Sequence, residues 1–452
     1  MKAVATILMI LYLGTSPVYW LPYLDVSLFS NIKFLLIASS IVLIWMLAFS
    51  NKGIVFPKGM VGPMGLLLLV LSAMFALLQA KEGLLVKRLI DMCLGFVMMW
   101  SFFLLTKNGG DIRRIFLYSA LTMAVLCWLT VTSKLLGVPV WVAPSVFNSD
   151  PLYVSGFGSL RTGWSGGIAL FIPVLLLLTS DNRSTFISII ITLLAIAGIV
   201  GSQLTVAGRA GLLASLMIIS LYSIVRVKKI YIVVIVLLMV VSVIPFSDYL
   251  LVHLRFDRLE GSGGSADVLN HFSAGRIGSY IQALSWFAEK PFTGFGFGQA
   301  TFGGHEIHNF WLRLLVEGGV LLPATFFSVL LAILFRLRKQ FKMLKNVNDH
   351  ELKDSSVSVY KYTNLNLSVL MIILCGVIIS FFEPNVFLGS FQNTAIWWAA
   401  AGVAIAMQEI KSDKDKNVVG DSLDVDTSSS AGINIEIESD TKWKSVKLKD
   451  KA

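Results

Sequence analysis

The feature that most constrains this chain is a series of about twelve apolar stretches, each long enough to cross a lipid bilayer. Crossing the hydrocarbon core takes about 20 residues of helix, and lipid offers peptide groups no hydrogen-bond partner, so each stretch is expected to be helical. The sequence therefore predicts an all-α polytopic membrane protein with about 12 transmembrane helices. The stretches lie near residues 3–24, 32–49, 61–79, 89–106, 114–136, 164–181, 185–203, 209–225, 230–246, 308–335, 364–382 and 389–408.

Composition and charge agree with this prediction. Hydrophobic residues make up 56% of the chain and charged residues 14%, which is too apolar for a soluble domain. The formal net charge is +10, but in a multi-pass protein Lys and Arg first indicate orientation, so no nucleic-acid partner is expected. With Lys2 inside, most basic loops fall on the same side, and both termini are predicted to be cytoplasmic. A basic group at Lys81, Lys87 and Arg88 falls on the other side and is the exception.

The polar segments divide the chain into two predicted regions. Residues 1–410 form a transmembrane domain with two outer loops, 137–163 and 247–307, and the larger loop is expected to contain short interfacial helices. Residues 411–452 are polar and rich in Ser, so they are predicted to form a disordered cytoplasmic tail.

Ionisable residues gather on the predicted outer side. Four of the five histidines lie in or at the end of the larger loop, and histidine is the side chain best suited to move protons near neutral pH. Arg161, Arg209 and Arg276 also lie on the side that basic residues normally avoid. A guanidinium at membrane depth is costly unless it is paired or hydrated, and an anionic ligand would supply the partner. For Arg209 the alternative is that the side chain extends to lipid headgroups.

The segment "RIGSYIQALSWFAEKPFTGFGFG" begins at Arg276 and predicts an interfacial helix followed by a tight turn. Apolar residues recur at helical spacing over 276–289, so this helix is expected to lie along the outer membrane surface. Gly294, Gly296 and Gly298 then allow tight turning after Pro291. Because no strand precedes these glycines, a dinucleotide-binding site is excluded.

The next segment, "HEIHNFWLRLLVEGG", carries the histidines of interest. His305 and His308 would lie one helical turn apart and could bind a metal ion, but no third ligand is evident, so we expect no metal and no other cofactor. For His305 a simple hydrogen-bonded interfacial role is the alternative. His308 stands beside Asn309 at the start of a span, where it is expected to face the same outer cavity as Arg209 and Arg276.

The helix that follows is predicted to be broken. Arg313 and Glu317 are four residues apart, so they can pair within one helix and lower the cost of burying either charge. Gly318 and Gly319 then allow a bend before the apolar second half crosses the membrane. A broken span with polar residues in its outer half is typical of helices that line a cavity.

Four segments, taken in order, resemble the bacterial O-antigen ligase and O-antigen polymerase superfamily over roughly residues 155–335. They are "LRTGWSGG", "GRAGLL", "GRIGSYIQALSWFAEKPFTGFGFGQATF" and "HNFWLRLLVEGGVL". The resemblance implies a GT-C-like glycosyltransferase of the bacterial inner membrane, with a periplasmic active site and a glycan donor carried on undecaprenyl pyrophosphate. It also implies that Arg209 and Arg276 bind the pyrophosphate and that His308 is the catalytic histidine. Arg161, Asn309 and His305 are the candidate substrate-binding residues.

The chemistry of these residue types suits that reaction. Arginines stabilise the negative charge that develops on a departing lipid pyrophosphate, and a neutral His308 can accept the proton of the attacking sugar hydroxyl. Attack opposite the leaving group predicts a metal-independent transfer that inverts the anomeric configuration.

The predicted function is therefore polymerisation of O-antigen or related surface-polysaccharide repeat units. Ligation of finished polymer to a lipid A core acceptor is the close alternative, because only the acceptor differs. A lipid-linked glycan transporter or flippase is the alternative of another class, since about twelve spans with cytoplasmic ends are common among transporters. Membrane lipid is an expected partner, and a chain-length regulator is kept open as another.

Overall fold

The computed structural model describes residues 1–19, 25–51, 53–136, 156–158, 161–179, 186–226, 276–302, 305–347, 356–384 and 386–423. The chain divides into a large unit, Met1–Glu409, and a small unit, Ile410–Ala452. Of the small unit, the described residues are the last part of helix α18.

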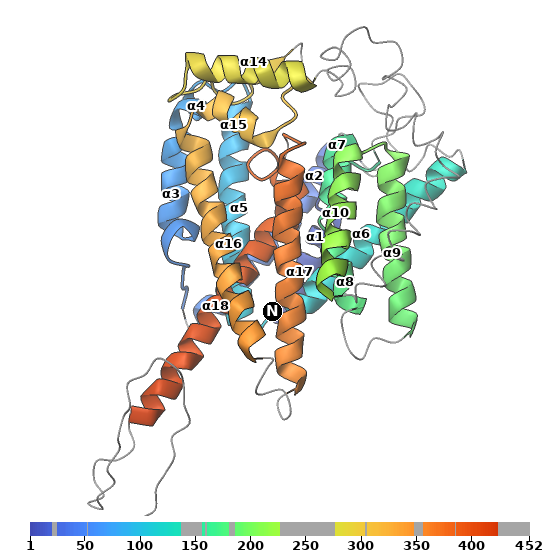
Figure 1. Cartoon of the computed structure of the whole chain (residues 1–452), viewed down its shortest axis with the longest axis vertical. Helices are drawn as coiled ribbons and strands as arrows, with labels where there is room; N and C mark the ends of the chain where they lie inside the picture. Colours follow the sequence, from blue (N-terminus) through green and yellow to red (C-terminus); the bar gives the residue numbers. More distant parts are fainter. Residues whose placement is uncertain are drawn as a thin grey trace, which may run out of the picture. The chain divides into compact units, whose positions relative to one another are not determined.

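Almost every element described is a helix (Figure 1). The one small sheet pairs β1 with β2 in antiparallel register, with Phe302 opposite His305. The elements are α1 (Lys2–Thr15), α2 (Val26–Asn51), η1 (Gly59–Val61), α3 (Pro63–Ser72), α4 (Met74–Leu78), α5 (Leu84–Lys107), α6 (Ile112–Leu135), α7 (Arg161–Ala169), α8 (Ile172–Thr179), α9 (Phe186–Thr205), α10 (Arg209–Arg226), α14 (Arg276–Glu289), β1 (Thr301–Phe302), β2 (His305–Glu306), α15 (Phe310–Gly318), α16 (Leu321–Val347), α17 (Ser356–Ser380) and α18 (Phe391–Leu423).

The predicted apolar stretches coincide with these helices. Each stretch contains one helix or a broken pair, except 230–246, which lies outside the described residues. Five helical segments are long and apolar enough to cross a membrane: Val26–Asn51, Leu84–Lys107, Ile112–Leu135, Phe186–Thr205 and Leu321–Arg338. The chain is thus helical with several candidate membrane spans, while the count of about twelve stays a prediction.

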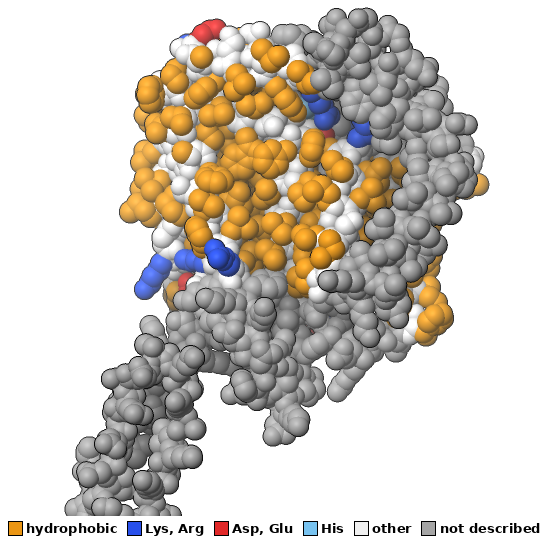
Figure 2. All heavy atoms as spheres, viewed as in Figure 1, with side chains coloured by type: hydrophobic (Ala, Val, Ile, Leu, Met, Phe, Trp, Pro, Cys, Tyr) orange, Lys and Arg blue, Asp and Glu red, His pale blue; other side chains and the backbone are white. Residues whose placement is uncertain are grey.

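Polar contacts gather several of the basic residues predicted to be cytoplasmic at one end of the helical bundle. Lys2 Nζ donates to Gly109 O at 2.8 Å, and Lys107 pairs with Glu409 at 2.7 Å. Arg336 Nη2 donates to Lys58 O at 2.9 Å. These contacts agree with the predicted grouping of basic loops on one side. Between this end and the opposite one, apolar side chains cover much of the visible face in Figure 2.

The opposite end is covered by α14, which lies across the bundle rather than along it (Figure 1). Its buried face includes Ala283, which packs with Ile307 and Val316 in a small apolar cluster. The predicted amphipathic helix over 276–289 is therefore confirmed with its boundaries unchanged. Ile281 and Leu284 remain exposed on α14, and its position along a membrane surface stays a prediction.

The glycine-rich turn after α14 joins it to α15. Gly294, Gly296 and Gly298 all have positive φ, so they form the tight turn that was predicted here. A Cβ at Gly296 would lie 2.2 Å from Gln79 O. Glu317 Oε1 accepts hydrogen bonds from Gly298 N at 2.8 Å and from Arg313 Nε at 3.0 Å. The predicted pairing of Arg313 with Glu317 is therefore confirmed, and the same carboxylate also holds the turn.

The predicted break in the span after Glu317 is also present. α15 ends at Gly318, Gly319 has φ +64°, and α16 begins at Leu321. A Cβ at Gly319 would lie 2.3 Å from Phe292 O, so the close approach of the turn after α14 requires glycine here.

Three predicted boundaries differ from the structure. The span expected from 308 begins at Phe310, because Asn309 caps the helix and leaves His308 in the preceding turn. The outer loop expected over 137–163 ends earlier, since Arg161 is already the first residue of α7. α18 continues past 410 to Leu423, so residues 411–423 of the predicted tail are helical, and 424–452 lie outside the described residues.

The Arg313–Glu317 pair generates a stability prediction. Both side chains are at most 2% exposed, so Glu317→Ala removes a buried counter-charge and the acceptor for Gly298 N together. We expect a loss of about 3–5 kcal/mol in the free energy of unfolding. Thermal unfolding of the purified protein in detergent measures the change. Glu289→Ala, at an exposed position of α14, is the control and should unfold like the wild type; equal stability of both variants would contradict the assigned role.

Candidate functional site

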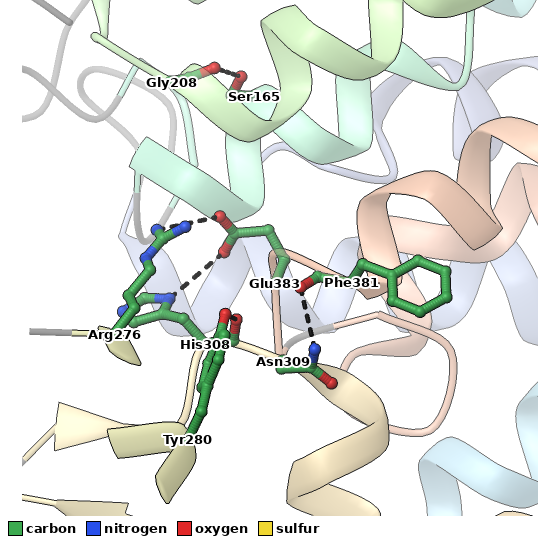
Figure 3. Close-up of polar contacts among 8 residues, drawn as sticks. All are labelled: Ser165, Gly208, Arg276, Tyr280, His308, Asn309, Phe381 and Glu383. Atoms are coloured by element: carbon green, nitrogen blue, oxygen red, sulfur yellow. Dashed lines mark hydrogen bonds and ion pairs between the residues drawn. The ribbon is translucent and has the colours of Figure 1, made fainter. Parts of the chain in front are cut away.

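The site is built around the turn between α14 and α15. Arg276 is the first residue of α14, and the hydroxyl of Tyr280, one turn later, donates to His308 O at 2.6 Å. This bond fixes the backbone of His308 against α14 (Figure 3). Burial raises the pKa of Tyr280 above its usual value, so the hydroxyl stays protonated and keeps its role as donor at neutral pH.

Asn309 gives the same turn a second anchor. Its side-chain oxygen accepts from Leu312 N at 3.0 Å and caps α15, satisfying one of the free amides at the helix start. Its Nδ2 donates to Phe381 O at 3.1 Å, just beyond the end of α17. Asn309 therefore joins the start of α15 to the segment that carries Glu383, and in this structure it positions its neighbours.

Glu383 is the residue on which Arg276 and His308 meet (Figure 3). Arg276 Nη2 lies 4.0 Å from Glu383 Oε1, and His308 Nδ1 lies 3.8 Å from Glu383 Oε2. Both distances are too long for hydrogen bonds. The guanidinium is close enough to attract the carboxylate, and the imidazole would be attracted in the same way once it carries a proton. The three side chains come from α14, the turn before α15 and the segment after α17, so the fold brings together residues more than one hundred positions apart.

Exposure differs sharply across this cluster. The side chain of Glu383 is 3% exposed, whereas those of Arg276 and His308 are 23% and 35% exposed. Among the described residues, neither carboxylate oxygen of Glu383 has a hydrogen-bond donor. A buried carboxylate without donors is costly, and the nearby guanidinium lowers that cost. The arrangement therefore leaves a cation and an imidazole partly exposed, with a buried carboxylate behind them.

The other predicted arginines begin the neighbouring helices. Arg161 is the first residue of α7, and Thr162 and Gly163, which follow it, line a pocket with Glu383. Arg209 is the first residue of α10. Ser165 Oγ donates to Gly208 O at 2.7 Å and fixes α10 against α7 (Figure 3). The structure thus brings Arg276 and His308 to the same carboxylate, while Arg161 and Arg209 begin the packed helices α7 and α10.

His305 differs from the prediction. It lies in β2 opposite Phe302, so His305 and His308 are not one helical turn apart, and the helical geometry considered for a metal pair is wrong. The backbone of His305 is described, while its side chain lies outside the described residues. Two other histidines of the larger loop, His253 and His271, also lie outside them.

Glu383 is the residue that sequence reasoning missed. It is the only Asp, Glu, Lys, Arg or His between Lys361 and Glu409. A single charge in a long apolar region is a recognised sign of a functional or paired group. Its place in the turn between two predicted spans made it resemble an ordinary loop residue.

Comparisons with known proteins add no identification to this geometry. No family model matches the chain, and no curated protein matches it.

Proposed function

We propose that this protein is a membrane glycosyltransferase that moves a glycan from a lipid pyrophosphate carrier to an acceptor hydroxyl. The observation that carries the proposal is the meeting of Arg276 and His308 on the buried carboxylate of Glu383. A permanent cation beside a partly exposed imidazole suits a reaction that expels an anion and removes a proton. The resemblance of the sequence motifs to the O-antigen polymerase and ligase superfamily supports the same reaction class.

In this mechanism Arg276 contacts the pyrophosphate oxygens. Negative charge accumulates on these oxygens as the bond from the anomeric carbon to the pyrophosphate breaks. A guanidinium is always charged and can contact two oxygens, so it stabilises the departing group without a proton transfer. Arg209 and Arg161, at the starts of α10 and α7, are proposed to extend the anion-binding surface. Chain topology favours the periplasmic side, because the basic loops gather at the other end of the bundle.

His308 is the proposed general base. Its Nδ1 faces Glu383, so Nε2 is the nitrogen that would take the proton from the acceptor hydroxyl as that oxygen attacks the anomeric carbon. Glu383 is a positioning residue in this scheme. Its carboxylate orients the ring and favours the positive charge that the imidazole gains on accepting the proton.

The first prediction concerns the base. In purified protein with lipid-linked glycan extracted from membranes as donor, His308→Ala should lower the transfer rate by about 10²–10⁴. Release of the lipid pyrophosphate and formation of the longer glycan are measured together. Arg276→Ala should also remove nearly all transfer, whereas Arg114→Ala, an exposed arginine paired with Asp111, should leave it unchanged. Near-complete activity in folded His308→Ala would remove the base assignment.

The second prediction concerns Glu383. Glu383→Gln keeps the size of the side chain but removes its charge, so His308 and Arg276 lose the group that orients them. Misplacement of catalytic groups by about 1 Å costs on the order of 10² in rate, and we expect a loss of about that size in kcat. Glu383→Asp, which keeps the charge at a shorter reach, should recover part of it. Unchanged kcat in both variants would exclude a positioning role.

A deletion strain distinguishes the two acceptors. If the protein polymerises repeat units, its loss should leave lipopolysaccharide carrying a single repeat. If it ligates finished polymer, its loss should leave the core bare and polymer retained on the lipid carrier. Gel analysis of lipopolysaccharide from the strain, with and without a plasmid copy of the gene, reads out the difference. An unchanged pattern would count against both forms of the proposal.

A further inference from the structure

A narrow pocket reaches Glu383 from the side of α7. Its walls come from α7, the end of α17 and the start of α18, and include Thr162, Gly163, Gly166, Glu383, Asn393 and Thr394. The free space between these residues is about that of one water molecule. It is therefore too small for a sugar ring, but it has the size of a single hydroxyl group.

Glycine keeps this space open. A Cβ at Gly163 would lie 3.0 Å from Asn393 Nδ2, and a Cβ at Gly166 would lie 3.1 Å from Ile379 Cγ2. These contacts are tight without being forbidden, so alanine could be accommodated at either position with small shifts. A methyl group at Gly163 would occupy space beside the amide of Asn393, at the wall of the pocket.

The carboxylate of Glu383 determines what the pocket can hold. Its oxygens are buried and, within the part of the chain that the structure describes, have no hydrogen-bond donor. A carboxylate is an acceptor only, so the group that fits must donate a hydrogen bond. The pocket lining contains neither Lys nor Arg, so a phosphate oxygen would meet repulsion from Glu383 there. A metal cation is disfavoured by Arg276 and His308, which already face the same carboxylate.

We infer that this pocket is a subsite for one hydroxyl group of the acceptor sugar, which donates a hydrogen bond to Glu383. The inference rests on the proposed function and adds the recognition of the acceptor to it. The hydroxyl held here is a second one, distinct from the hydroxyl that His308 deprotonates. Glu383 therefore divides the site, with the pyrophosphate on the exposed side of Arg276 and the neutral sugar edge on the side of α7.

The size of the pocket gives a specificity rule. An acceptor with a free hydroxyl at the anchored position fits, and an acceptor with a bulkier substituent there, such as an acetamido group, does not. A deoxy sugar fits but leaves Glu383 without its donor. Hydrogen bonds to charged groups are worth enough to change binding by about tenfold or more, so the deoxy acceptor should bind more weakly by at least that factor.

The test uses Gly163→Ala, with Gly201→Ala as the matched control. Gly201 lies in α9 and, like Gly163, has one close neighbour for an added Cβ, Val131 Cγ2 at 3.1 Å. The donor is the extracted lipid-linked glycan. Two acceptors are tried, the repeat unit released from the donor by mild acid and deacylated core oligosaccharide, and the one that the wild type uses is kept for the measurement. Gly163→Ala should raise the acceptor KM by about tenfold or more and leave the donor KM within about twofold, and Gly201→Ala should match the wild type.

Monodeoxy versions of that acceptor separate recognition from packing. For the wild-type protein, removing the anchored hydroxyl should raise the acceptor KM by about tenfold. Gly163→Ala should use this deoxy acceptor and its parent equally well, because the substitution and the deoxygenation remove the same hydrogen bond to Glu383. Independent, multiplying losses would overturn the subsite, as would an unchanged acceptor KM in folded Gly163→Ala. If the wild type transfers glycan to neither acceptor, the proposed function fails and the subsite fails with it. If the wild type transfers glycan but Gly163→Ala leaves the acceptor KM unchanged, only the subsite is rejected.

Discussion

The arrangement of the site depends on one buried negative charge. The side chain of Glu383 is 3% exposed, and the two groups proposed to do the chemistry lie on its more exposed side. Burying a carboxylate without a partner costs folding free energy. The burial of Glu383 is therefore tolerated only while Arg276 and His308 stay close to it. The two contacts link α14, the turn before α15 and the segment after α17 through one carboxylate.

The surrounding fold keeps these three elements in register through short polar contacts. Tyr280 holds the His308 backbone, and Asn309 both caps α15 and reaches Phe381. Glu317 plays the same part at the other end of α15, where it joins Arg313 to the glycine-rich turn. Each contact satisfies a polar group that has lost water, so this end of the bundle is both a folded cap and a scaffold for the candidate site.

Much of the fold could be predicted because the membrane imposes a simple rule. Apolar length predicted nearly all the helices, the spacing of apolar residues predicted α14, and Gly318–Gly319 predicted the break in the span. Boundaries that depend on a single cap were less accurate, as at Asn309. Arg276 stood out because its charge conflicts with the expected orientation, and His308 because it stands beside Asn309 at the predicted start of a span. Glu383 did not, because its significance comes from two residues far away in the sequence, and local spacing carries no information about that contact.

The same long-range packing accounts for Arg88, one of the three residues that form the exception to the orientation rule. Arg88 is 4% exposed, and its guanidinium donates to the carbonyls of Leu388 and Gly389, in the turn between α17 and α18. Lys33 is also buried and donates to Ser16 O at 2.8 Å, Val18 O at 2.6 Å and Gln392 Oε1 at 3.2 Å. Both cations replace water around carbonyl groups that no helix satisfies, so their charge contributes to packing and carries little information about loop orientation. Arg88 holds the turn that follows Glu383, and Lys33 reaches Gln392 at the start of α18, so both cations help to hold the part of the chain that leads from Glu383 into α18.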